Sequence, residues 1–443
     1  MAFNIRTREI PYTIASTVLL LLSVLLFATR PDAPAICIVS IGLVAVFLLK
    51  FRASIPMLLL FLFIFAYPFE TTNWFYRSHI PLSVYREFST DVLTNKVLIC
   101  NNLFVFALGN VLSQKAAGQK IVFSAIAPHS VYVYAILVAI GVLMIQFGIK
   151  GQTLLSGNTY GHGSEKSTLH EYFILCYFLI LLFSPRKNFV VLAINALLYL
   201  FYCVKTFLYG GRVEVLEITI LAGYYFWVLP HKASKVVIAL LLLVGMYASF
   251  VVGNVRTYPF DLLAGKYNRI FNPLEETKRT YAASNQGDVF YASQRLTGMV
   301  DEGIIPAGMR VKSFGAFLAS IFVPSSRIPD YGNLASYQQK KYGSGGGGLI
   351  GSFFYVWMGY AGPLLIGWFI GFFVNRAFLS PKLALKVYGI AILTMMPRWY
   401  AYGPIQLFKF CFFTAVMYVV FRFVYQIFFR KHPRLKKPMQ AQI

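Results

Sequence analysis

Charged residues are scarce in this sequence. They make up 13% of its 443 residues, whereas hydrophobic residues make up 58%. An ordinary soluble domain has about 25% charged and about 45–50% apolar residues. The composition therefore excludes a soluble enzyme, a disordered scaffold and a collagen-like protein.

Cysteine and the common catalytic motifs are scarce as well. The five cysteines lie inside apolar runs, and the sequence has no Cys-x-x-Cys and no His-x-x-x-His pair. The glycine run 345–348 is not followed by Gly-Lys-Ser/Thr, so close helix packing by small residues explains it better than a phosphate loop. We expect no metal, no cofactor and no nucleotide-binding fold. Energy for any chemistry must then come from the substrate or from an ion gradient.

What the sequence does contain is a series of long apolar runs. A membrane helix needs about 20 mostly apolar residues, and the runs predict an all-α polytopic integral membrane protein with about 12 transmembrane helices. The predicted spans are 11–29, 33–49, 53–69, 91–112, 131–148, 171–184, 189–209, 213–229, 236–253, 349–375, 387–403 and 405–429.

The basic residues indicate how these spans are oriented. Lysine and arginine number 40 against 16 aspartates and glutamates, which gives a formal net charge of +24. With a cytoplasmic N-terminus, 18 basic residues and a single acidic one, Glu9, fall in cytoplasmic segments. This asymmetry follows the positive-inside rule and predicts that both termini are cytoplasmic. The first apolar run has no signal-peptide cleavage site.

Four regions follow from this pattern. They are helices 1–9 in residues 1–253, a large outer loop in 254–348, helices 10–12 in 349–429 and a basic cytoplasmic tail in 430–443. Within the loop, the apolar stretch 313–323 has only eleven residues, which predicts a short re-entrant or interfacial helix. The loop also holds eleven Lys/Arg against seven Asp/Glu, and this outer positive charge indicates an anionic ligand.

One group of candidate functional residues follows the seventh predicted span. Lys205 lies about two turns before Arg212, which comes directly after the glycine pair 210–211. Glu214 and Glu217 begin the next span. Ionisable groups are costly in a membrane, so this stretch is either an anion site or a packed ion-pair network.

Two further arginines lie in predicted outer segments. Arg398 stands beside three aromatic residues in the hairpin 397–404, and Arg327 lies in the segment 324–329. An arginine with aromatic neighbours can anchor at the membrane interface. Its planar fork also suits phosphate oxygens.

Candidates for a general base are few. His162, His170 and Glu171 are predicted on the outer face. Partial burial of Glu171 would make it a base. A helix-start carboxylate stabilised by the helix dipole is the plainer explanation of the same residue.

The order of these features resembles a known family. A Gly-Gly-Arg turn is followed by a long outer loop, the segment PSSRIP at 324–329, a glycine-rich lead into GSFFYVWMGYAG at 351–362, and a last outer hairpin with an arginine. Over residues 200–430 the chain resembles the Wzy-type repeat-unit polymerases of bacterial O-antigen, enterobacterial common antigen and exopolysaccharide synthesis. The N-terminal third is similar only in hydropathy and span count.

The resemblance implies a GT-C-like glycosyltransferase of the bacterial inner membrane, with a periplasmic loop and active site. Such enzymes move a growing glycan from undecaprenyl diphosphate to a new lipid-linked repeat unit, with inversion at the anomeric carbon. The implied partners are undecaprenyl-diphosphate-linked oligosaccharide, membrane lipids and a chain-length-regulating co-polymerase, and no nucleic acid is expected.

The resemblance assigns the diphosphate leaving group to Arg212, Arg327 and Arg398, and Lys205 is an additional candidate for this role. Fixed cations stabilise negative charge on a departing diphosphate. Glu171 or His170 is the candidate base, although neither matches a family motif. The candidate sugar-binding aromatics are Tyr342, Tyr355, Trp399 and Tyr400.

Three alternatives stay open, and one of them is a structural or scaffolding membrane protein. An O-antigen ligase of similar fold would share the basic outer site. A lipid-linked oligosaccharide flippase or other transporter belongs to a different class. Against it, no inverted repeat is visible in the sequence, and the polar residues gather at outer span ends rather than at the midplane.

Overall fold

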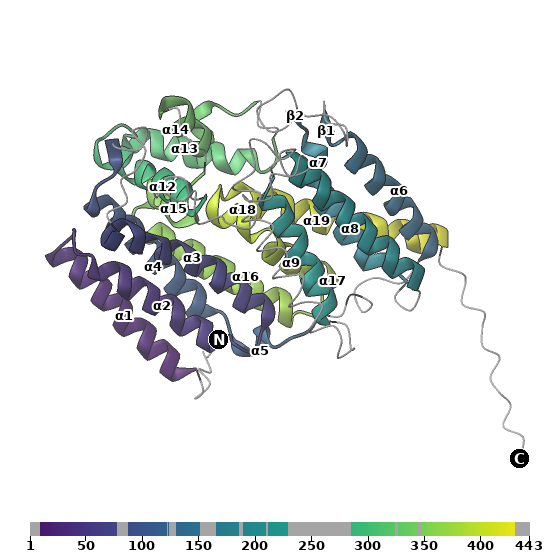
Figure 1. Ribbon diagram of the computed structural model, residues 1–443, viewed down its shortest axis with the longest axis horizontal. Coiled ribbons are helices and arrows are strands. Elements are labelled where there is room, and N and C mark those ends of the chain that lie inside the picture. The colour runs from purple at the N-terminus through teal and green to yellow at the C-terminus, as the bar shows by residue number, and fades with distance from the viewer. Residues whose placement is uncertain are drawn as a thin grey trace, which may run out of the picture.

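The computed structural model of the chain describes residues 9–77, 87–121, 123, 130–150, 165–185, 189–209, 211–228, 285–323, 327–342 and 347–429. These residues form helices and one pair of two-residue strands (Figure 1). The N-terminal part holds α1 (Ile10–Thr29), α2 (Ala35–Lys50), α3 (Ile55–Arg77), α4 (Asp91–Val111), α5 (Gln114–Ala117), α6 (Val131–Phe147), β1 (Ile149–Lys150), β2 (Glu165–Lys166), α7 (Thr168–Phe183), α8 (Phe189–Tyr209) and α9 (Val213–Val228). The C-terminal part holds α12 (Asn285–Asp301), α13 (Ala307–Ser320), η6 (Asp330–Gly332), α14 (Leu334–Tyr342), α15 (Ile350–Met358), α16 (Ala361–Leu379), α17 (Leu383–Thr394), α18 (Met396–Ala401), α19 (Ile405–Val424) and η7 (Tyr425–Phe429).

The helices are those of a polytopic membrane protein. Six of them, in α1, α3, α4, α8, α16 and α19, are long and apolar enough to cross a membrane, and α2, α6, α7 and α17 are shorter apolar helices. Large apolar side chains also face outward; on α1, Leu21 is 63% and Leu25 is 61% exposed. A soluble protein would not leave such a surface in water. The predicted all-helical membrane class is therefore confirmed.

The predicted spans agree with the helices only in part. Segment 236–253 lies outside the described residues, and the other eleven segments contain helices. The prediction that 349–375 and 387–403 each form a single helix is wrong, because the first breaks at Gly359 and the second at Met395. Gly359 has a φ of +62°, in the left-handed region that favours glycine, so α15 ends there. The total of twelve spans stays a prediction.

Small residues allow α16 to lie close against α4. A Cβ on Gly367 would collide with the carbonyl oxygen of Phe104, and one on Gly371 would lie 3.1 Å from the carbonyl oxygen of Leu108. Only glycine leaves room for this approach of two backbones. The spaced glycines of α16 thus serve helix packing.

Connections that were predicted to share a side of the membrane meet at the same end of the bundle. At one end, Glu9 accepts a hydrogen bond from the Gln114 amide at 3.0 Å and lies 3.4 Å from Lys50 Nζ. At the other end, Asn95 Nδ2 donates to the carbonyl of Pro31 at 2.9 Å. The start of α1, the end of α2 and α5 therefore lie together, opposite the start of α4.

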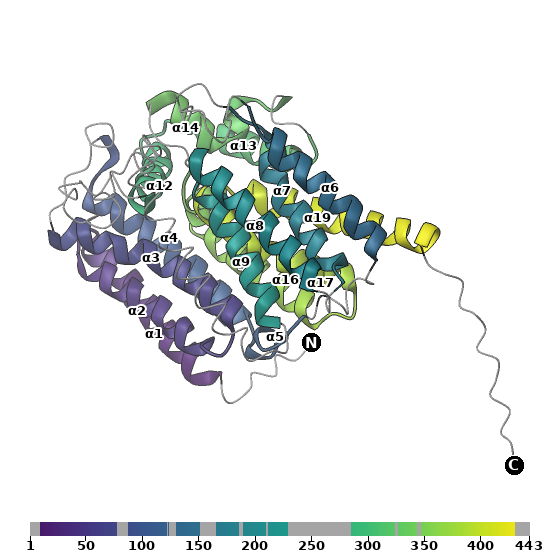
Figure 2. The ribbon, with the colours of Figure 1, turned by 45° about the vertical axis from the view of Figure 1, so that its right-hand side comes forward.

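Helices α12 to α14 cover the second end of the bundle (Figures 1 and 2). Lys96 Nζ on α4 donates to both carboxylate oxygens of Asp301, at 2.5 and 2.6 Å, and so fastens α12 to the bundle. Helix α13 has 14 residues, too few to cross a bilayer. Its Val311 is 73% exposed, and Phe322, just after the helix, is 76% exposed. These features agree with the predicted interfacial position.

Candidate functional site

Arg398 brings together carboxylates from two helices, α7 and α9. It lies in α18, a helix of six residues between α17 and α19. Its Nη2 is 3.0 Å from Glu171 Oε1 and contacts Glu214 Oε1, and its Nε is 4.0 Å from Glu217 Oε1. We call these four residues the Arg398 cluster. It lies at the end of the bundle that α12 to α14 cover.

Local structure explains why the carboxylates lie there. Glu171 is in the first turn of α7 and Glu214 in the first turn of α9, where the helix dipole favours negative charge. The turn between α8 and α9 is tight, because the Gly211 amide donates to the carbonyl of Thr206 at 2.9 Å. A Cβ on Gly211 would lie 2.7 Å from Thr206 Cγ2 and 3.0 Å from Glu214 Oε2. Glycine therefore makes room for the inward turn of Glu214.

The cluster is buried on one side and open on the other. The side chains of Glu214 and Glu217 are 4% and 1% exposed, whereas that of Glu171 is 32% exposed. Buried carboxylates require compensation, and Arg398 supplies positive charge to both. The sequence indicated a cationic site here, but the cluster has three carboxylates for one guanidinium group. Glu171 is the carboxylate that a ligand can reach.

Two other predicted phosphate ligands differ in their placement. Arg212 is partly buried and immediately precedes α9, two residues before Glu214; its carbonyl accepts from the Leu216 amide at 3.1 Å. Lys205 is buried, and its Nζ donates to the last carbonyls of α6, those of Ile145 and Gln146, at 2.7 Å each. Lys205 thus neutralises a helix C-terminus.

Arg327 is exposed, just before η6. Of the predicted segment 324–329, the first three residues lie outside the described part of the chain. His162 also lies outside it.

The two candidate bases have opposite environments. His170 is fully buried; its Nε2 lies 3.0 Å from Thr206 Oγ1, and its ring stacks on Tyr202 at 4.7 Å between centroids. The side chain of the next residue, Glu171, points to Arg398 instead. A general base must reach its substrate, so the geometry favours Glu171.

Two of the predicted sugar-binding aromatics are packed inside the protein. Trp399 and Tyr400 are both 0% exposed. Trp399 Nε1 donates to the carbonyl of Ile392 at 2.7 Å, and the Tyr400 hydroxyl donates to Asn101 Oδ1 at 2.7 Å. These rings anchor α18 to α17 and α4, and neither has a face open to a sugar.

The other two aromatics lie next to basic side chains. Arg295 Cζ is 6.0 Å from the ring centroid of Tyr342, which is partly buried, and Lys96 Nζ is 4.8 Å from that of Tyr355, which is buried. Cation–π contacts of this kind hold neighbouring helices together. Burial raises the pKa of the Tyr342 hydroxyl, so Tyr342 stays a neutral hydrogen-bond donor.

A cavity of about 450 Å³ lies beside α18, between α13, η6, α14, α15 and the start of α19. Gly403 lines the cavity, and its amide donates to the Arg398 carbonyl at 3.1 Å. The ring of Tyr402 lies 5.8 Å from Arg398 Cζ. This cavity was not predicted from the sequence, although the polar run 330–340 in an otherwise apolar chain was a signal for it.

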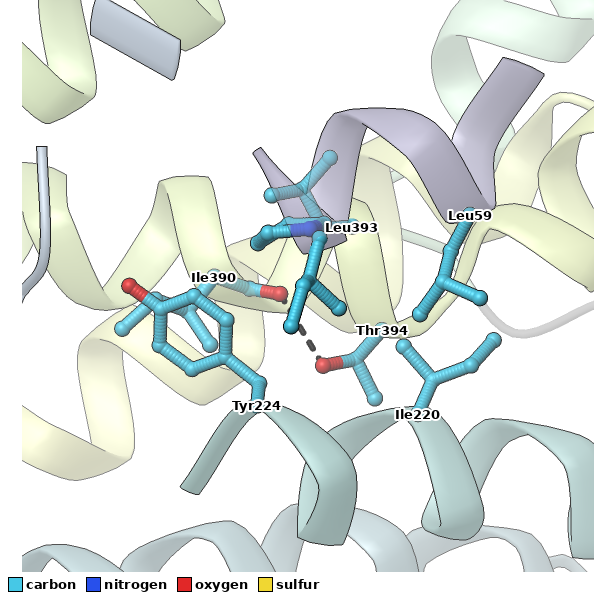
Figure 3. A pocket seen from close by; sticks show the side chains of 8 residues that line it. Leu59, Ile220, Tyr224, Ile390, Leu393 and Thr394 are labelled. Atoms are coloured by element: carbon cyan, nitrogen blue, oxygen red, sulfur yellow. Dashed lines mark hydrogen bonds between the residues drawn. The ribbon is translucent and has the colours of Figure 1, made fainter. Parts of the chain in front are cut away.

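A smaller pocket inside the bundle has a different character. Figure 3 shows Leu59, Ile220 and Leu393 around it, and the Thr394 hydroxyl donates to the carbonyl of Ile390 at 3.0 Å. Its volume is about 10 Å³, close to that of a single water site. We interpret it as a packing gap.

Metal chemistry has no support in the described residues. Among them, no group of three His, Cys, Asp or Glu side chains could hold a metal ion. All five cysteines are buried and free.

The comparisons with known proteins place the chain in no family. No protein-family model matches the sequence, no curated protein is significantly similar to it, and no solved structure matches it. Any function must therefore be argued from the residues and their geometry.

Proposed function

We propose that this protein is a membrane glycosyltransferase that polymerises lipid-diphosphate-linked oligosaccharide repeat units. The observation that supports this most is the Arg398 cluster, in which a reachable carboxylate, Glu171, lies 3.0 Å from an arginine. The cluster lies where membrane helices end, so it can meet a substrate whose lipid stays in the bilayer and whose sugars lie in water.

The proposed reaction is a direct displacement. The acceptor hydroxyl oxygen attacks the anomeric carbon of the donor sugar, and the bond from that carbon to the diphosphate oxygen breaks. Glu171 takes the hydroxyl proton, and the lipid diphosphate leaves as the anion. Arg398 holds Glu171 in place, while Glu214 holds Arg398 from the buried side.

Arg212 is the proposed main ligand of the departing diphosphate. It is partly buried at the start of α9, where the helix N-terminus adds positive potential. Arg398 adds to this stabilisation, and exposed Arg327 meets the outer part of the substrate. A glycosyl diphosphate is already activated, so the reaction needs no nucleotide.

The proposed location is the bacterial inner membrane, with the Arg398 cluster on the periplasmic side and a chain-length-regulating co-polymerase as partner. The basic residues support this orientation, since 18 of them lie in the segments assigned to the cytoplasm.

The test is an assay of the purified chain in lipid nanodiscs. It is mixed with a lipid-diphosphate repeat unit, without nucleotide, and the products are separated on a gel. We expect a ladder of repeat lengths. A folded protein that makes no ladder with the natural repeat unit would overturn the proposal. Transfer of one preformed glycan to lipid A core would assign a ligase instead.

A further inference from the structure

The 450 Å³ cavity beside α18 has two kinds of wall. One wall is aromatic and comes from α13 and α15, with Phe317, Phe353 and Trp357. The other is polar and comes from η6 and α14. The volume falls within the about 300–1,000 Å³ of small-molecule sites.

The aromatic wall is held in a fixed orientation. The rings of Phe317 and Trp357 lie 4.6 Å apart between centroids, with 30° between their planes. Trp357 Nε1 donates to Ser313 Oγ at 3.1 Å, which uses the polar atom of the ring and fixes its direction. Phe317, Phe353 and Trp357 are 4%, 3% and 9% exposed, so the wall presents a small apolar surface to the cavity. The C–H face of a sugar ring suits it.

The polar wall offers hydrogen-bonding groups of both kinds. Lys340 Nζ donates to Asp330 Oδ1 at 2.6 Å, and both side chains are more than 60% exposed, at 65% and 64%. An exposed ion pair contributes little to stability, so both groups can turn to a ligand. Asn333 and Ser336 stand next to them along the cavity. The Ser336 amide donates to Asn333 Oδ1 at 3.3 Å, which fixes the Asn333 side chain.

A backbone hydrogen bond links the wall of the cavity to Arg398. Pro404 and Gly403 line the cavity, and the Gly403 amide donates to the Arg398 carbonyl. A ligand in the cavity therefore lies against the loop that follows α18, the helix that carries Arg398.

We propose that this cavity is a carbohydrate subsite that binds the non-reducing end of the acceptor glycan. A small apolar wall opposite carboxylate, amide, hydroxyl and ammonium groups matches a sugar, which has an apolar face and a rim of hydroxyls. A lipid chain would leave the groups of the polar wall without hydrogen-bond partners. The assignment of the sugar to the acceptor rests on the proposed function, whereas carbohydrate binding does not.

The test measures binding apart from catalysis. The probe is the oligosaccharide released by mild acid from the cell's own lipid-linked repeat units, titrated calorimetrically into the full chain in nanodiscs. Ser336→Phe fills the cavity and is expected to weaken binding by about tenfold or more. Asp330→Asn with Lys340→Gln changes only exposed groups and should weaken binding by about threefold or more.

Matched controls come from the same helix. Gln339→Phe and Lys341→Gln alter exposed side chains of α14 that do not line the cavity, and they should bind the probe as the wild type does. Glu171→Gln should lower the rate of ladder formation and leave probe binding unchanged, because Glu171 does not line the cavity.

The two proposals fail in different ways. Wild-type protein that forms a ladder but does not bind the probe would overturn the subsite alone. If Ser336→Phe and the Asp330→Asn, Lys340→Gln double variant both bind the probe as the wild type does, the subsite is likewise overturned. Probe binding that the cavity variants weaken, in a protein that forms no ladder, would overturn the polymerase and leave the carbohydrate subsite standing.

Discussion

Arg398 Nη2 lies 3.0 Å from Glu171 Oε1, although 227 residues separate the two in the sequence. The contact joins α18 to the start of α7 and so makes one site from the middle and the end of the chain. Arg398 is held from the buried side by Glu214, while Glu171 keeps 32% of its side chain exposed. The pair thus presents one fixed carboxylate to a ligand.

Glu171→Gln is expected to lower kcat for ladder formation by about 10²–10⁴-fold, because an amide cannot accept the proton of the acceptor hydroxyl. The substitution preserves shape, so the Tm should change little. The rate is measured from single-turnover gels and the Tm from a thermal unfolding assay.

His170→Gln is the control for Glu171→Gln. His170 is buried against Thr206 and Tyr202, so this variant should lose stability and keep its rate per folded molecule. If it loses the ladder while Glu171→Gln keeps it, the base is His170.

Arg398→Ala should abolish the ladder and also destabilise the protein. It removes the cation that faces Glu214 and Glu217, whose side chains are 4% and 1% exposed, and losing one partner of a buried ion pair costs about 3–5 kcal/mol. The double variant Arg398→Ala with Glu214→Gln should recover part of the Tm and none of the activity. A ladder in this double variant would show that Arg398 has only a structural role.

The apolar helices could be predicted from the sequence, but their interruptions could not. The runs of α1 and α4 are long and continuous, and hydropathy alone locates them. The breaks at Gly359 and Met395 lie inside equally apolar runs. Hydropathy does not register a single left-handed residue such as Gly359, because a break of this kind depends on backbone conformation and packing.

For the site, the sequence identified members but not their arrangement. Glu171 and Arg398 were candidates because each stood in a predicted outer segment, yet their pairing depends on how α7, α9 and α18 pack. Trp399 was expected at an open hairpin, but α18 folds inward and buries it. Lys205 donates to carbonyls 60 and 59 residues away along the chain, which no local pattern reveals.

Lys205→Met is expected to lower stability and preserve the ladder. The ammonium donates two hydrogen bonds to the end of α6, and hydrogen bonds to charged groups contribute about 1.5–3 kcal/mol each. Lys409→Met is the control, because its single bond, to the Val323 carbonyl, is 3.4 Å long. A Lys205→Met protein with unchanged Tm and no ladder would instead assign Lys205 to the diphosphate.

Gly367→Ala should destabilise the bundle because it separates two backbones that now touch. The added Cβ would collide with the Phe104 carbonyl oxygen and lie 3.1 Å from Ala107 Cβ, and overpacking of this kind costs about 1–3 kcal/mol. Gly223→Ala is the matched control: it is also a glycine inside a helix, yet its Cβ would meet nothing within 4 Å. Alanine favours helix over glycine by about 0.8–1.0 kcal/mol, so the control should be neutral or stabilising. Equal Tm values for the two variants in the same detergent would mean that α4 and α16 are not in backbone contact.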